Sequence, residues 1–182
     1  MQPPNCKKIL LKSKEMSKRQ NIKIALYGYG NPEKQDAGLG VQCARKLEKW
    51  IREEEPDLNV DIECRTQLEI SDVERIAGKD IVIFVDSSKE NISDFYLSKV
   101  VPANHGEEAV PERLIYLCKK RFNKTPMAFK LHIRGYKWRD CSQLSEKAAQ
   151  NVMKAIQFLK EKLKKPDVFI HAYEDKCSID IV

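Results

Sequence analysis

Apolar residues follow two patterns along the chain, and the two patterns alternate. Short and mostly apolar runs are typical of buried β-strands, and the clearest of them lies at residues 80–86. Between such runs, apolar residues recur at helical spacing, as Ala44, Leu47, Trp50 and Ile51 do. The patterns predict strands that start at residue 22 and span residues 58–64, 80–86, 95–101, 127–133 and 167–173, with helices near residues 38–54, 72–77, 114–118 and 143–163.

The order of these elements predicts the fold class. Strands that alternate with helices of about 10 to 20 residues form a mostly parallel sheet with right-handed crossovers. The continuous apolar run at residues 80–86 fits a strand that helices cover on both faces. We therefore expect an α/β fold with three layers, α/β/α, around a twisted and mostly parallel sheet of about five strands.

Composition sets the domain organisation. Residues 1–20 are rich in lysine and lack apolar periodicity, so we expect a flexible basic amino-terminal extension followed by a single domain at residues 21–182. No apolar run approaches the roughly 18 residues of a membrane span, and residues 1–17 lack the apolar centre of a signal peptide. These features predict a cytoplasmic protein without a membrane partner. The six cysteines contain no C-x-x-C pair, which favours reduced core thiols.

A glycine-rich segment follows the first strand. Gly28, Gly30 and Gly38 lie where the backbone can approach a bound ligand closely, and Asn31 belongs to the same loop. The dinucleotide-binding motif needs a third glycine three residues after the second, and that position is Glu33. The segment therefore predicts a binding loop at the edge of the sheet but does not favour a dinucleotide.

Three polar residues follow predicted strands and are candidates for the chemistry. Asp36 lies in the loop after the first strand, Asp86 ends the strand at residues 80–86, and His105 lies in the loop after the next extended segment. Ligands of open α/β sheets bind beyond the carboxyl ends of the strands, so these side chains can converge on one crevice. Two carboxylates and an imidazole suit a zinc or nickel ion, or an acid/base pair acting on water. A simpler interpretation is a loop-capping aspartate, a strand-end aspartate and a surface histidine.

Two other kinds of chemistry rank lower. The net charge is +6, and residues 134–139 interleave basic and aromatic side chains, a pattern that nucleic-acid-binding proteins use. A solvated loop with one anchoring aromatic side chain explains this segment more simply, so the sequence does not favour nucleic acid as a partner. A cysteine nucleophile also lacks a local signature, because Cys43 and Cys118 lie at positions of buried thiols and His132 and His171 fit structural roles.

Several of these features, taken in order over residues 22–163, resemble the nickel-iron hydrogenase maturation endopeptidases: Gly28-x-Gly30-Asn31, Asp36-x-Gly38-x-Gly40, Val85-Asp86, and His105 before a leucine-bearing helix. The resemblance implies an enzyme that removes a carboxyl-terminal extension from the large subunit of a hydrogenase after nickel insertion. It implies that the large-subunit precursor is the partner. It further implies that Asp86, His105 and a carboxylate of the glycine loop hold a divalent ion or approach nickel carried by the substrate.

One ligand position departs from the family's pattern. The family's loop reads acidic, acidic, glycine, with the second acidic residue as the ligand, whereas this chain has Asp36, Ala37 and Gly38. An alanine supplies no lone pair. Two rebuilt sites remain open, one in which Asp36 turns inward and one in which Glu107 or Glu108 reaches across from beside His105.

The departure leaves two functional hypotheses. The first is an endopeptidase that uses a divalent metal, nickel carried by its substrate, with Asp86, His105 and Asp36 at the site. The second is a homologue of impaired activity that docks a metalloprotein precursor or another partner without cutting it, which Ala37 favours. The sequence also leaves open that no metal is tightly bound, and that the protein is a monomer or a weak homo-oligomer.

Overall fold

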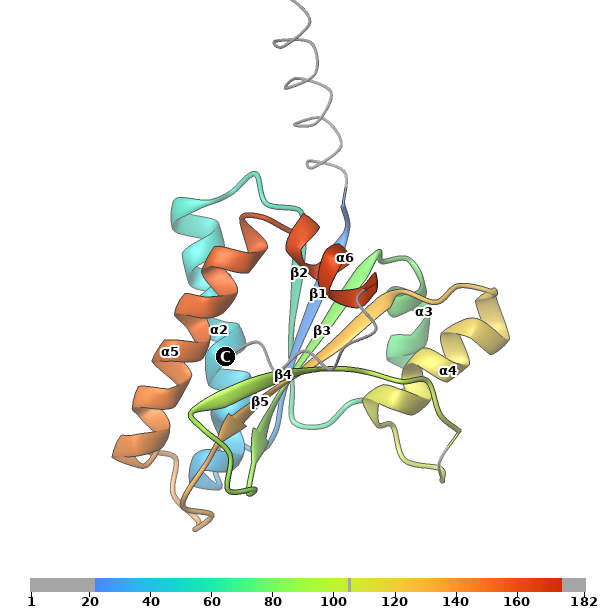
Figure 1. Ribbon diagram of the computed structural model, residues 1–182. Helices are drawn as coiled ribbons and strands as arrows, with labels where there is room; N and C mark the ends of the chain where they lie inside the picture. Colours follow the sequence, from blue (N-terminus) through green and yellow to red (C-terminus); the bar gives the residue numbers. More distant parts are fainter. Residues whose placement is uncertain (1–21, 105, 175–182) are drawn as a thin grey trace, which may run out of the picture.

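The computed structural model describes residues 22–104 and 106–174 (Figure 1). The strands are Ile24–Tyr29 (β1), Val60–Arg65 (β2), Ile81–Ser88 (β3), Phe95–Lys99 (β4) and Met127–Arg134 (β5). The helices are Leu39–Glu54 (α2), Val73–Ala77 (α3), Pro111–Phe122 (α4), Glu146–Leu163 (α5) and Asp167–Glu174 (α6), with short 3-10 turns at Gln35–Gly38 (η1) and Ile70–Asp72 (η2).

The five strands form one sheet in the order β2-β1-β3-β5-β4. Neighbouring strands are parallel except for β4, which runs antiparallel to β5. Helices α2, α5 and α6 cover one face, and α3 and α4 cover the other (Figure 1). The predicted three-layer α/β/α fold with a mostly parallel sheet of about five strands is therefore confirmed.

The central strand β3 shows why its sequence is apolar without interruption. Ile83 and Val85 belong to the core under α2 and α5, whereas Val82 and Phe84 belong to the core under α3 and α4. All four side chains are fully buried. Because both faces of this strand are covered, it has no solvent-facing position until its carboxyl end.

One predicted strand is wrong. Residues 167–173 form helix α6, which carries Phe169 and Tyr173 one helical turn apart. Both rings pack against Phe129 of β5, with ring centroids 5.3 Å and 5.7 Å away. Two aromatic contacts with one side chain at a spacing of four residues require a helix, since a strand would place the two rings about 13 Å apart.

Residues 1–20 lie outside the described residues, so their separation from a domain at residues 21–182 remains a prediction. Among the helices that the structure describes, none combines the length and the apolar character that a membrane crossing requires.

Helix α2 packs on β1 through glycines. A Cβ added to Gly28 would overlap the carbonyl oxygen of Gly40 and the Cβ of Ala44 in α2. Gly30 has a φ of 128°, a conformation that residues with side chains rarely adopt. The glycine-rich segment therefore lets α2 lie close to the sheet and turns the chain sharply at the strand's end.

A buried carboxylate ties this turn to the loop after β5. Asp36 is fully buried, and its Oδ2 accepts hydrogen bonds from the backbone N–H groups of Tyr136 and Lys137 at 2.7 Å and 2.8 Å. The backbone N–H of Ser145 donates to Oδ1 at 2.8 Å, and the Ser145 hydroxyl donates to Oδ2 at 2.7 Å. Four donors thus meet one carboxylate and fix residues 135–145 against η1.

We expect Asp36→Asn to lower the free energy of unfolding by about 3 kcal/mol, because the amide turns two donors toward the N–H groups that now meet a carboxylate. Burial raises the pKa of Asp36, but hydrogen bonds from Ser145, Tyr136 and Lys137 outweigh it and hold the pKa below its ordinary value. The carboxylate therefore stabilises the fold above the ordinary aspartate pKa of about 3.9 and loses this effect as the pH falls through the lowered pKa.

Urea unfolding of the wild type and Asp36→Asn from pH 7 to pH 3 measures this difference. The difference in the free energy of unfolding between the wild type and Asp36→Asn should become smaller as the pH approaches 3. Asp140→Asn, an exposed carboxylate in the same loop, is the matched control and should change stability by less than about 0.5 kcal/mol. Equal stability of the wild type and Asp36→Asn at pH 7 would contradict the claim that Asp36 holds the loop after β5 against η1.

We expect Gly28→Ala to lower the free energy of unfolding by about 1 to 3 kcal/mol, because its Cβ overlaps backbone that cannot move without shifting α2. Gly78→Ala is the control, since a Cβ there meets the Arg75 carbonyl oxygen at an ordinary 3.5 Å. Thermal unfolding followed by circular dichroism measures both variants. A Gly28→Ala variant as stable as Gly78→Ala would show that α2 is not held by this contact.

Candidate active site

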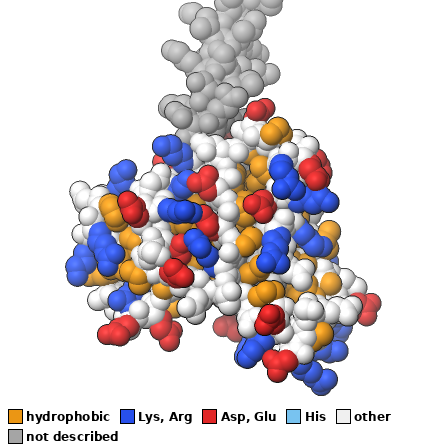
Figure 2. Space-filling view, turned by 180° about the vertical axis from the view of Figure 1, so that it is seen from behind, with side chains coloured by type: hydrophobic (Ala, Val, Ile, Leu, Met, Phe, Trp, Pro, Cys, Tyr) orange, Lys and Arg blue, Asp and Glu red, His pale blue; other side chains and the backbone are white. Residues whose placement is uncertain are grey.

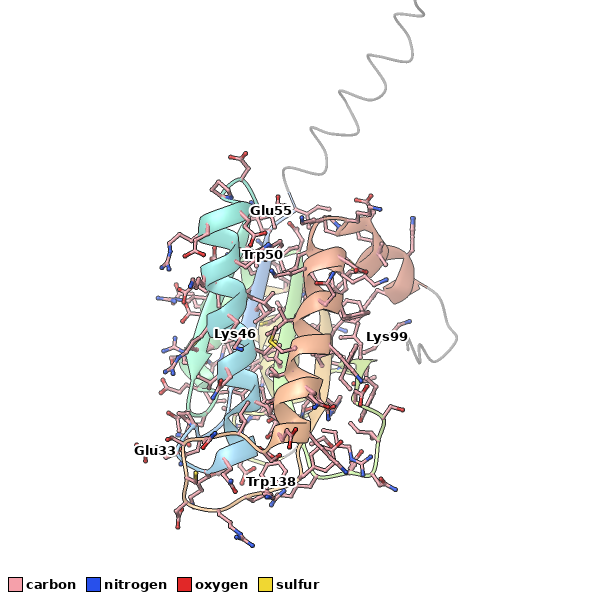
Figure 3. All side chains as sticks on the ribbon, turned by 90° about the vertical axis from the view of Figure 1, so that its left-hand side faces the viewer. Glu33, Lys46, Trp50, Glu55, Lys99 and Trp138 are labelled. Atoms are coloured by element: carbon pink, nitrogen blue, oxygen red, sulfur yellow. The ribbon has the colours of Figure 1, made fainter. Side chains whose placement is uncertain are left out.

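The loops after β1 and β5 meet at the carboxyl-terminal edge of the parallel strands. Figure 3 shows Glu33, from the loop after β1, and Trp138, from the loop after β5, at the same end of the molecule and opposite Glu55. Backbone hydrogen bonds join the two loops, from the Gln35 N–H to the Cys141 carbonyl and from the Cys141 N–H to the Glu33 carbonyl. This edge is where ligands of open α/β sheets bind.

Asp86 is placed at this edge by β3. The strand was predicted to end at Asp86, but it continues for two more residues to Ser88. The Asp86 side chain is 22% exposed, and its Oδ2 lies 3.3 Å from Nζ of Lys130 on β5. Its Oδ1 accepts a hydrogen bond from the Ser87 N–H at 2.7 Å. The carboxylate is therefore accessible to a ligand but already has protein partners.

A tyrosine completes the surroundings of this carboxylate. The Tyr29 hydroxyl makes a side-chain hydrogen bond with Asp86. Burial, followed by the charge of Asp86, this hydrogen bond and the charge of Glu112, raises the pKa of Tyr29 far above its ordinary value. The hydroxyl thus stays protonated and donates to the carboxylate.

His132 lies next to Asp86 on the neighbouring strand. The register pairs Asp86 with His132, and His132 with Tyr96 on β4. The imidazole stacks on the Tyr96 ring at a centroid distance of 4.3 Å, and its Nε2 lies 3.0 Å from the Ser98 hydroxyl. Burial, together with Lys130, lowers the pKa of His132 to about 4, although Asp86 partly opposes the shift. The imidazole is therefore neutral at pH 7.

We call Tyr29, Asp86, Ser98, Lys130 and His132 the Asp86 cluster. Sequence reasoning identified Asp86 but missed Tyr29 and Lys130 as its partners. The alternation on β5 was a usable signal, because Lys130 and His132 point to one face while Leu131 and Ile133 are buried on the other. The register that brings Lys130 toward Asp86 is set by the pairing of β3 with β5, and the sequence of neither strand predicts it.

The other predicted site residues have different positions. Asp36 points into the loop after β5, where its four hydrogen bonds would have to break before it could turn toward a ligand. Glu107 and Glu108 are exposed in the loop before α4. His105 lies outside the described residues. The proposed roles of Asp36, Asp86 and His105 in catalysis and metal binding therefore remain predictions.

The glycines of the predicted binding loop are used for packing. Gly28 lies against Gly40 and Ala44, Gly30 lies against the Ala37 carbonyl, and a Cβ at Gly38 would come 2.6 Å from the Pro32 Cα. Asn31 accepts a hydrogen bond from the Glu33 N–H at 2.9 Å through its side-chain oxygen, as in an Asx turn. Contact of Gly28, Gly30, Asn31 and Gly38 with a ligand is untested.

The described residues do not build a three-ligand metal site. In residues 22–104 and 106–174, no three His, Cys, Asp or Glu side chains gather closely enough to hold an ion. Ala37 contributes no donor atom, and the Asp86 carboxylate is paired with an ammonium group. Whether Asp86 holds a metal ion together with His105, which lies outside the described residues, stays a prediction.

Of the four cysteines that the structure describes, Cys43 and Cys118 have the predicted core position, whereas Cys64 is half-buried and Cys141 is exposed. Cys43 and Cys118 are fully buried. Burial raises the pKa of Cys43 to about 12 and that of Cys118 to about 11, so neither is a thiolate at pH 7. Neither therefore supplies a nucleophile.

The basic and aromatic loop at residues 134–139 is tied down by internal contacts. Lys89 lies over the Trp138 ring at 5.0 Å, and Arg134 lies over the Tyr136 ring at 5.0 Å. On the face shown in Figure 2, Lys and Arg side chains are interspersed with Asp and Glu side chains instead of forming one basic patch. This arrangement gives no support to nucleic-acid binding on that face.

Known structures with the same arrangement identify the fold. No protein-family model and no curated sequence matches the chain. Among solved structures, the NiFe hydrogenase maturation protease HycI of Thermococcus kodakarensis KOD1 is 20% identical with a TM-score of 0.62, over 79% of this chain and 93% of that one. The hydrogenase maturating endopeptidase HybD of E. coli is 12% identical with a TM-score of 0.62, over 80% and 94%. The hydrogenase 2 maturation peptidase of Thaumarchaeota archaeon SCGC_AB-539-E09 is 17% identical with a TM-score of 0.58, over 78% and 98%. The chain therefore has the fold of the NiFe hydrogenase maturation proteases.

Proposed function

We propose that this protein is an endopeptidase of hydrogenase maturation, which removes a carboxyl-terminal extension from the large-subunit precursor of a NiFe hydrogenase. The observation that carries the proposal is a partly exposed carboxylate, Asp86, at the carboxyl-terminal edge of a fold shared with three such proteases. Its neighbour is the glycine loop whose pattern resembles theirs. The likeness to these proteases supports the proposed enzyme class.

The chain's own residues prepare the site. Tyr29 and the Ser87 N–H donate to Asp86 and hold the orientation of its carboxylate. Asp36 fixes the loop after β5 beside the glycine loop, so that both walls of the edge keep their positions when a precursor binds. His105 is proposed to act with Asp86. Nickel that arrives as part of the precursor would polarise the scissile carbonyl group or a water molecule beside it.

A second candidate function is a docking protein that binds the precursor without cutting it. Two observations favour it: Ala37 stands where the resembled family has an acidic ligand, and the carboxylate beside it, Asp36, is engaged by four donors. Binding needs a complementary surface, whereas hydrolysis also needs an activated water in the correct place. The two candidates share a partner and differ only in the chemical step.

We expect the wild type to shorten the nickel-loaded large-subunit precursor, and intact-mass analysis of the precursor measures the loss of its carboxyl-terminal fragment. Asp86→Asn and His105→Ala should each slow the cleavage at least about 100-fold, since each removes a group at the reacting centre. Asp57→Asn, an exposed carboxylate in the loop between α2 and β2, is the control and should cleave like the wild type. Cleavage that survives Asp86→Asn unchanged would remove Asp86 from the mechanism.

The same assay separates the two candidates through Ala37→Asp. If the wild type cuts the precursor, the protein is a protease without this ligand. If only Ala37→Asp cuts it, while the wild type captures the uncut precursor in a pull-down, the protein is a docking homologue. Ala37→Asn has nearly the same size without the charge and should not gain cleavage. If the wild type neither cuts nor captures the precursor, both candidates are wrong.

A further inference from the structure

We propose that Lys130 is a built-in counter-cation of Asp86, which occupies the place beside this carboxylate and keeps free divalent metal ions from binding there. The inference concerns the isolated protein and holds whether or not the chain cleaves a precursor. It assigns a role to Lys130 that neither the fold nor the proposed function requires.

The strand register brings the ammonium group to the carboxylate. In the pairing of β3 with β5, Lys130 lies opposite Phe84, and Asp86 lies opposite His132. Lys130 and Asp86 are thus one step of two residues apart on the same face of the sheet. The four-carbon stem of Lys130 spans this step, and Nζ reaches to 3.3 Å from Oδ2 of Asp86.

Partial burial strengthens the ion pair between Lys130 and Asp86. The Lys130 side chain is 20% exposed and the Asp86 side chain 22% exposed, so solvent screens this pair less than an ion pair on the open surface. The stem has neighbours on the same face of the sheet, because Phe84 lies opposite Lys130 on β3 and His132 follows it on β5. Lys130 therefore has less freedom to swing away from the carboxylate than an exposed lysine.

The remaining contacts of Asp86 also oppose the binding of a divalent ion. The Ser87 N–H donates to Oδ1, and the Tyr29 hydroxyl is hydrogen-bonded to the carboxylate. A divalent ion would have to compete with these donors for oxygen lone pairs and would lie close to the ammonium charge of Lys130. Like charges at this distance repel strongly in a partly buried site.

No other described side chains compensate for this repulsion. Ala37 supplies no donor atom, and no three potential ligands gather among the residues that the structure describes. Metal sites bind tightly when several ligands act together, and the loss of even a supporting contact costs about 10- to 100-fold in affinity. An ion pair between protein groups therefore takes the place of metal ligation at Asp86.

Calorimetric titration of the full chain with NiCl₂, in a buffer containing a phosphine reductant, tests the inference. We expect Lys130→Met to bind Ni²⁺ about tenfold more tightly than the wild type, because Met keeps the length of the stem and removes the charge. Lys130→Arg keeps the charge and should bind like the wild type. Lys120→Met removes an exposed lysine on α4 and controls for the change in net charge.

A double variant locates the gained site. Lys130→Met combined with Asp86→Asn should lose the tighter binding, since Asp86 is the proposed ligand. The inference is overturned if wild type and Lys130→Met bind Ni²⁺ equally, if Lys130→Arg gains the same affinity as Lys130→Met, or if the gain persists without Asp86. Circular dichroism verifies the fold of each variant, and Lys130→Gln replaces Lys130→Met with the same expectations if that variant does not fold. Because no precursor is used, failure of this test is distinct from failure of the proposed function.

Discussion

The buried carboxylate of Asp36 is the constraint on which the functional edge of this protein depends. It lies about a hundred residues from its partners in the chain and accepts four hydrogen bonds from Tyr136, Lys137 and Ser145. A buried carboxylate with fewer partners would cost more in lost hydration than it returned. The complete set of donors makes the charge tolerable, and it also holds the loops after β1 and β5 as one wall.

This constraint changes the meaning of the acidic motif. A carboxylate beside a glycine-rich turn is a natural candidate for a ligand, but here the residue that points into the protein is Asp36 and its neighbour on the chain is Ala37. The four hydrogen bonds therefore occupy Asp36, and Ala37 has no side-chain donor atom to offer in its place. What remains is Asp86, which has an ammonium group, a phenolic hydroxyl and a backbone N–H around it.

The sequence was sufficient for the fold and for part of the site, and the reason differs from element to element. The uninterrupted apolar run of β3 predicted a strand covered on both faces, because no other element needs apolar residues at every position. The strand predicted at residues 167–173 was wrong, since a short apolar run can have the same composition in a strand and in a helix that packs on one aromatic side chain. Asp86 was visible because it breaks an apolar pattern.

The partners of the site residues could not be predicted. Lys130 meets Asp86 only through the register of β3 with β5, and Asp36 meets its donors only through the folding of a distant loop. The sequence around each residue predicts neither of these two contacts. Position after a strand therefore indicates which side chains reach the functional edge, whereas the contacts there decide which of them are free to do chemistry.

The central claim is that a hydrogenase large-subunit precursor binds at the edge formed by the loops after β1, β3 and β5. Hydrogen exchange followed by mass spectrometry, with and without the nickel-loaded precursor, tests it most directly. The account predicts slower exchange at residues 30–38 and 135–145 when the precursor is present, and unchanged exchange at residues 55–59 on the opposite edge. Protection confined to that opposite edge, or no protection on either edge, would contradict it.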